Sequence, residues 1–108
     1  MKLQMKAGVL VLALMAGAAM SFAQSGGEAT YKAKCQMCHG ANGEGDTPAG
    51  KAMKVKPFSD PILMKMSDTT LLGLTKNGVG KMPAFKDKLT DAQIQEVVSY
   101  VHGLQKKK

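Results

Sequence analysis

The clearest pattern of hydrophobic and polar positions lies at the C-terminal end of the chain. Apolar residues recur there at helical spacing and form one stripe: Ile94, Val97, Val98, Val101 and Leu104. Thr90 and Gln93, just before the stripe, are spaced as a capping box. Lys106 to Lys108 add positive charge at the end where the helix dipole favours it. The pattern predicts an amphipathic helix from about residue 90 to the C-terminus.

An earlier segment, residues 26–37 (GGEATYKAKCQM), is rich in helix formers. Glu28 falls in its first turn, where the helix dipole favours negative charge. Residues 40–50 follow, with four glycines and one proline (GANGEGDTPAG), a composition that breaks regular structure. We therefore expect a helix over 26–37 and a loop over 40–50.

Two further helices are expected in the middle of the chain. Asp60 and Pro61 suit the N-cap and first position of a short helical turn. Ser67 or Asp68 begins another helix, which contains three leucines and ends at residues 77–78 (Asn-Gly). No window shows sustained alternation. The predicted fold class is all-α, with three to four helices joined by long loops.

The N-terminal 23 residues have the pattern of a secretory signal peptide. Lys2 and Lys6 form a positive region, and an uncharged apolar run of 14 residues, 7–20, follows. Small residues at Ser21 and Ala23 then place the cleavage site after Ala23. An uncleaved anchor is the alternative, but the run is shorter than the roughly 20 residues that span a bilayer. We expect 1–23 to be removed, 24–108 to form one domain, and the protein to be exported to the periplasm without a membrane span.

Composition and size exclude several classes of protein and of partner. The chain is 44% hydrophobic and 21% charged, which excludes collagen-like and low-complexity chains and argues against general disorder. Removing 23 of the 108 residues leaves 85, a domain so small that it often needs a disulfide, metal or cofactor for stability. The net charge is +7, and all 15 basic residues are Lys. Because Arg supplies the bidentate fork for bases and phosphates, we expect no nucleic-acid partner.

The two cysteines supply the candidate chemistry. Cys35 and Cys38 are followed directly by His39 in the sequence Cys-Gln-Met-Cys-His, the known c-type haem attachment pattern. Two thiols three positions apart on one helical turn can add to the two vinyl groups of one porphyrin edge. The adjacent imidazole then reaches the iron as proximal ligand. We expect one covalently bound haem c, attached through Cys35 and Cys38, with His39 as a ligand of the iron.

Three other interpretations of the cysteines remain open. A disulfide closing so small a loop would constrain the unfolded chain very little. A thioredoxin-like redox pair needs a βαβ framework, and no strand pattern is found. A zinc site needs four ligands, which Cys35, Cys38, His39 and His102 could only just supply.

The opposite axial position of the iron has six candidates, Met37, Met53, Met64, Met66, Met82 and His102. Met37 lies inside the attachment motif, too close to cross to the opposite face. Met64 and Met66 lie in an apolar turn, where Met usually fills the core. Met82 stands between two glycines and Pro83, which together favour close backbone approach to a ring and an extended Met. We therefore predict Met82 as the second ligand, with His102 as its leading substitute.

These residues resemble the small bacterial class I cytochromes c. The resemblance covers the Cys-Gln-Met-Cys-His motif, the Gly-x-Gly-Lys-Met-Pro-Ala-Phe stretch at 78–85 and the C-terminal amphipathic helix. It implies that Gly27 and Tyr31 of the first helix pack against Val97 and Tyr100 of the last. It also implies that the carbonyl of Pro48 accepts a hydrogen bond from the imidazole Nδ1–H of His39.

An iron with His and Met at both axial positions has no open site for oxygen activation, and Met/His ligation raises the reduction potential. We therefore expect an electron-transfer protein rather than an enzyme. The alternatives are a haem enzyme or gas sensor, which needs an absent or labile Met82, and a small haem subunit of a larger oxidoreductase complex.

Five lysines flank the predicted haem ligands, Lys34, Lys76, Lys81, Lys86 and Lys88. Around an exposed haem edge they would steer redox partners with acidic docking surfaces. The alternative is ordinary solvated surface, because further lysines stand at 51, 54 and 56. We expect a monomer whose partners are redox proteins.

Overall fold

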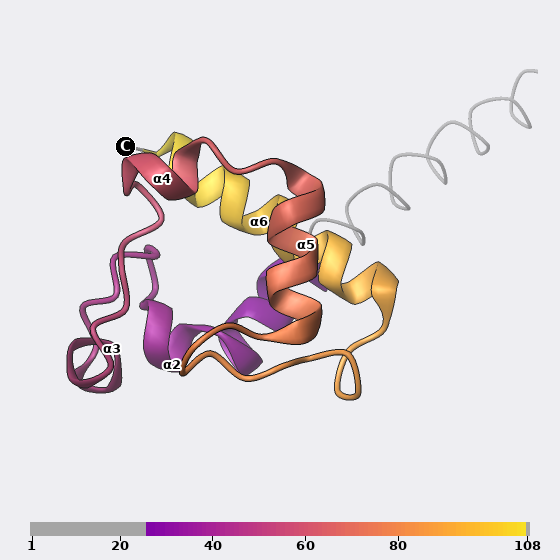
Figure 1. Cartoon of the computed structure of the whole chain (residues 1–108), viewed down its shortest axis with the longest axis horizontal. Helices are drawn as coiled ribbons and strands as arrows, with labels where there is room; N and C mark the ends of the chain where they lie inside the picture. The colour runs from indigo at the N-terminus through magenta and orange to yellow at the C-terminus, as the bar shows by residue number, and fades with distance from the viewer. Residues whose placement is uncertain (1–25, 108) are drawn as a thin grey trace, which may run out of the picture.

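A computed structural model describes residues 26–107, so the predicted signal segment 1–23 lies outside the described residues. Residues 26–34 are helical, and the helices that follow are α2 (Gln36–His39), α3 (Pro48–Ala52), α4 (Pro61–Met64), α5 (Asp68–Asn77) and α6 (Asp91–Lys106) (Figure 1). Within 26–107 the only pairing of β type is an isolated bridge between Val79 and Met82. The predicted all-α class is confirmed. None of the described helices is long and apolar enough to cross a membrane.

The helix starts predicted from capping residues are confirmed. The Thr90 hydroxyl accepts from the Gln93 amide (3.1 Å), and the Gln93 side chain accepts in return from the Thr90 amide (2.9 Å). The Ser67 hydroxyl caps α5, and the Asp60 carboxylate caps α4 with Pro61 at the first position. Each cap satisfies an amide that the first turn of a helix leaves unpaired.

Two local predictions are wrong. Residues 48–50 belong to a helix, α3, because the Thr47 hydroxyl accepts from the Gly50 amide (2.9 Å) and Pro48 occupies the first helical position. The predicted helix over 26–37 is interrupted at Cys35, whose φ of −118° departs from helical geometry. These single-turn helices raise the number of helices above the three to four expected.

The core of the described residues is divided into two small clusters that meet along α6. One joins Phe85, Leu89, Ile94 and Val98, and the other joins Tyr31, Val97 and Leu104. In Figure 1, α5 lies alongside α6, and α2, α3 and α4 surround the remaining sides of the molecule. Because Val97 and Val98 are neighbours that serve different clusters, α6 is the element that joins the two halves of the core.

The contact between the first helix and α6 is as the family resemblance implies. Tyr31 is fully buried, its ring lies 5.1 Å from that of Tyr100, and it shares a cluster with Val97. A Cβ on Gly27 would stand 2.5 Å from the backbone oxygen of Glu96, so only glycine allows the two helices to approach this closely.

This contact generates a paired prediction. Replacing Gly27 by Ala pushes a methyl group into α6 backbone, and we expect it to lower the free energy of unfolding by about 1–3 kcal/mol. The same change at Gly103 of α6, where a Cβ would meet nothing within 4 Å, is expected to raise it by up to about 1 kcal/mol. Thermal unfolding followed by circular dichroism measures both. Equal responses of the two variants would contradict the close helix contact.

Candidate functional site

A cavity of about 410 Å³ lies at the centre of the described structure, between the two core clusters. Its lining is mostly apolar and comes from the first helix, α2, segments 53–58 and 79–85, α5 and α6. All four predicted site residues line it, namely Cys35, Cys38, His39 and Met82. The volume is in the range of small-molecule and cofactor pockets, about 300–1,000 Å³.

The two cysteines are free thiols, and both are half-buried. Cys35 lies at the break between the first helix and α2, and Cys38 lies within α2. Burial raises the pKa of the Cys35 thiol to about 11, so this thiol stays protonated at neutral pH. Among residues 26–107 no group of three or more His, Cys, Asp or Glu side chains could hold a metal ion, so the structure does not assemble the four-ligand zinc set.

The short helix α2 is held in place by contacts to its carbonyl groups. The Thr47 hydroxyl donates to the Met37 carbonyl (2.6 Å), and the Tyr31 hydroxyl donates to the carbonyl of Gly40, directly after His39 (2.6 Å). Gly50 of α3 lies so close to the Cys38 carbonyl that no Cβ could be accommodated there. The backbone that carries Cys38 and His39 is therefore fixed from two sides.

His39 presents a neutral imidazole to the cavity lining. Burial lowers its pKa, which favours the neutral ring that can act as a metal ligand. The ring stacks on Phe58, with centroids 4.8 Å apart and planes 22° from parallel. Its Nδ1 is buried and has no hydrogen-bond partner in the described part of the chain. The implied hydrogen bond from His39 to the Pro48 carbonyl is therefore wrong for this structure, in which Pro48 begins α3.

Met82 reaches the cavity from a tight turn. Val79 and Met82 exchange backbone hydrogen bonds of 3.1 and 2.9 Å, and the Met82 side chain packs against the Phe85 cluster. Gly78 has a φ of +77°, and a Cβ there would stand 2.7 Å from the Met82 oxygen. The turn itself therefore requires a glycine at this position.

The other candidates for the second axial position differ in whether they line the cavity. Met53 also lines the cavity, but Met37, Met64, Met66 and His102 do not. Met64 is 51% exposed, so its predicted place in the core is wrong. His102 instead uses its ring nitrogens in contacts with Asp68 and Gln105.

Three lining features were missed by sequence reasoning: the Phe58 ring, the Tyr31 hydroxyl and the buried amide of Gln105. Gln105 had a detectable signal, because it stands at helical spacing from Val98 and Val101 and so continues the apolar stripe with a polar residue. Phe58 had none, since it lies in an irregular segment whose path only the fold reveals.

The cavity fits the expected haem in chemistry. It offers two unpaired thiols near one short helix, a neutral imidazole beside them and a thioether from a separate loop, within an apolar lining. A second hollow of about 400 Å³, between α5 and α6, surrounds the Lys76–Asp91 ion pair and has no thiol, imidazole or thioether in its lining.

Comparison with known proteins gives consistent matches. Residues 22–101 match the family model described as cytochrome c oxidase, cbb3-type, subunit III. The chain is 37% identical to cytochrome c6 of Leptolyngbya boryana, over 73% of this chain and 88% of that protein. It is 32% identical to cytochrome c-555 of Chlorobaculum tepidum, over 86% and 87% of the two chains. The solved structure of the KustC0563 c-type cytochrome matches with a TM-score of 0.67 and 30% identity, over 73% of this chain and 96% of that one.

A further relative is much longer than this chain. The cbb3-type cytochrome c oxidase subunit CcoP of Azospirillum brasilense is 34% identical over 72% of this chain. The matched region is only 27% of that subunit. The chain therefore spans most of the length of the c6 and c-555 relatives and about a quarter of this oxidase subunit.

The divided core generates a prediction about folding. A Cys35→Ala/Cys38→Ala variant has no thiols through which to hold a group covalently in the cavity. We expect it to be largely unfolded, because the apolar lining of the cavity would lose the surface that it buries against. Far-UV circular dichroism measures the loss of helix. A native-like spectrum would contradict the prediction.

Proposed function

The chain belongs to the class I cytochrome c family, and on that premise we propose that it is a soluble, exported electron carrier with one haem c. The haem is attached covalently and supplies one iron that exchanges single electrons between its ferrous and ferric states. The chain's own residues must hold the haem, supply its axial ligands and contact redox partners.

Four residues would hold the haem in this proposal, with thioether links at Cys35 and Cys38 and axial ligands at His39 and Met82. The observation that carries the proposal is that Met82 and His39 line one cavity from independent elements, a loop and α2. With the His39 imidazole and the Met82 thioether both bound to the iron, no coordination position would be left for oxygen. That favours a carrier over a gas sensor or a haem enzyme.

The surroundings of these residues suit repeated electron exchange. The tight turn at 78–82 and the braced carbonyls of α2 hold the two ligands on fixed backbone, so a change of charge at the iron needs little rearrangement. The lining of the cavity is mostly apolar, which would limit the access of water to a bound haem. We propose that the protein acts as a monomer, because one chain supplies all four groups.

A second candidate function is supported by the match to the CcoP subunit. The chain would then be a small haem subunit held in a larger oxidoreductase complex. Purification of the native protein from membranes and from the soluble fraction separates the two. Recovery as a free monomer supports the carrier, and stable co-purification with other subunits supports the complex.

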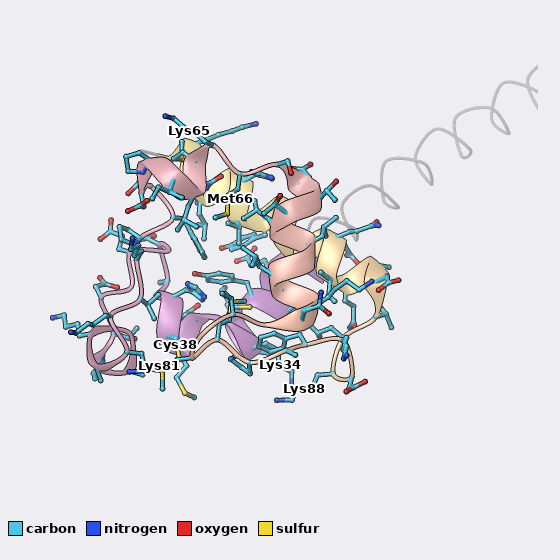
Figure 2. All side chains as sticks on the ribbon, in the orientation of Figure 1. Lys34, Cys38, Lys65, Met66, Lys81 and Lys88 are labelled. Atoms are coloured by element: carbon cyan, nitrogen blue, oxygen red, sulfur yellow. The ribbon has the colours of Figure 1, made fainter. Side chains whose placement is uncertain are left out.

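We propose that partners dock at the mouth of the cavity through a basic rim, which consists of Lys34, Lys54, Lys56 and Lys81. Figure 2 shows Lys34, Lys81 and Lys88 on the same side of the molecule as Cys38, with Lys65 on the opposite side. Two lysines of the set expected from the sequence have other partners: Lys76 pairs with Asp91 (3.1 Å), and Lys88 lies 5.7 Å from the centre of the Phe85 ring. An acidic partner surface would complement the rim.

The axial assignment is tested by Met82→Ala. Axial ligands set haem potentials over a range of roughly 0.8 V, and loss of the thioether is expected to lower the midpoint potential by a tenth of that range or more. The variant is also expected to bind cyanide rapidly. Potentiometric titration and absorption spectroscopy measure both effects. Met53→Ala removes the other methionine of the cavity lining and serves as the matched control. The assignment fails if Met53→Ala has the larger effect or if Met82→Ala keeps the parent spectrum.

The basic rim is tested by a pair of charge reversals with the same change in net charge. Lys81→Glu lies on the rim, and Lys65→Glu lies on the opposite side of the molecule. We expect oxidation by ferricyanide, an anion, to slow severalfold in Lys81→Glu and to slow with rising salt in the parent protein, because local charge steers encounter. Stopped-flow spectroscopy measures the rates. Equal slowing by both variants would show that net charge alone matters.

A further inference from the structure

A chain of polar contacts connects the surface of the molecule to the stack on His39. Gln105 is the only buried polar or charged residue within 26–107. Its Nε2 donates to the Phe58 carbonyl (3.0 Å), 47 residues away in sequence. Its Oε1 lies 3.0 Å from Nδ1 of His102, and Nε2 of His102 lies 2.6 Å from Oδ1 of Asp68. The contacts link α6, α5 and the irregular segment that carries Phe58.

Phe58 is held by its backbone at both ends. Its amide donates to the Gly43 carbonyl (2.8 Å), and its carbonyl accepts from Gln105. With the backbone held at these two points, the Phe58 ring stacks on the His39 ring, with centroids 4.8 Å apart. It also lies edge-on to the Tyr31 ring, with centroids 6.3 Å apart. Because segment 53–58 is irregular, the Gln105 contact supplies a restraint that no helix or sheet provides there.

The stack on Phe58 bears directly on the orientation of the His39 ring. Such histidines usually donate their second N–H to an acceptor, which fixes the plane of the ring. Here the buried Nδ1 of His39 has no partner in the described part of the chain. The structure does place the ring against Phe58, in a stack with centroids 4.8 Å apart, while α2 carries its backbone.

We propose that Gln105 is a positioning residue for His39, which acts by fixing Phe58 against the imidazole, with His102 and Asp68 setting the orientation of the Gln105 amide. The proposal rests on the proposed function, in which His39 is a ligand of the haem iron. It assigns to α6 a task beyond packing, because one buried amide on this helix controls the plane of a ring that α2 carries.

The chemistry of the four groups gives the amide only one orientation. The Phe58 carbonyl is an acceptor, so Gln105 must turn its NH₂ group toward it. The oxygen of the amide then faces Nδ1 of His102 (3.0 Å), and the carboxylate of Asp68 faces Nε2 (2.6 Å). Both oxygens are acceptors, so each contact is a hydrogen bond when its ring nitrogen carries the proton. A flipped amide would place oxygen against oxygen at Phe58 and is disfavoured.

The test uses the haem-loaded protein and two changes of the same kind on one helix. Gln105→Met keeps the length of the side chain and removes both hydrogen bonds. Gln95→Met makes the same change at an exposed position of α6. Proton NMR of the oxidised protein records the paramagnetically shifted resonances of the His39 ring. We expect Gln105→Met to move these resonances and the midpoint potential, and Gln95→Met to leave both at their parent values.

A double-mutant cycle separates positioning from general stability. In a Phe58→Leu background the ring through which Gln105 acts is absent, so Gln105→Met is expected to cause no further shift of the His39 resonances. Asp68→Asn, a change at an exposed residue, is expected to shift them in the same direction by less. If Gln105→Met does not fold, the Asp68→Asn shift decides the matter, and its absence overturns the proposal.

The possible failures are distinguishable. Parent-like His39 resonances in a folded Gln105→Met protein of lower thermal stability would overturn the positioning role and leave the proposed function intact. Absence of shifted His39 resonances from the parent protein itself would instead overturn the axial role of His39, and the inference with it.

Discussion

The structure depends on burial of apolar surface around a central cavity that the polypeptide does not fill. Within residues 26–107 the buried residues form two small clusters that both include residues of α6, and both contribute to the lining of the cavity of about 410 Å³. Hydrophobic stabilisation scales with apolar area removed from water, so a domain divided in this way gains little from its side chains alone. In the proposed function, a covalently bound haem c would complete the core, and folding would then depend on its attachment.

The elements around the cavity serve this constraint in different ways. Gly27 brings the first helix against α6, and Tyr31 fills the contact while its hydroxyl holds the carbonyl after His39. Thr47 and Gly50 brace α2 from the other side. The tight turn at 78–82 brings a thioether to the cavity from a distant part of the sequence. Fixed backbone at both proposed ligands is what a site needs for changing charge with little rearrangement.

Much of this arrangement could be predicted from local sequence. The caps at Thr90, Ser67 and Asp60 act through neighbouring amides, so their helices were placed correctly. The same cap-and-proline signature at residues 47–48 begins α3, although the glycines around it indicate a loop. Long-range contacts cannot be predicted from local sequence. The stack of Phe58 on His39 and the hydrogen bond from Gln105 to Phe58 form only when α6 meets an irregular segment. The partner that the family resemblance implies for the His39 Nδ1, the Pro48 carbonyl, is not in contact with it in the described part of the chain.

The central claim is that a haem attached through Cys35 and Cys38 occupies the cavity, and the mass of the intact, denatured protein tests it most directly. Denaturing mass spectrometry removes every group that is not covalently bound. The account predicts a mass greater than that of the polypeptide by one haem. A mass equal to that of the polypeptide alone, for protein purified from its native source, would contradict it.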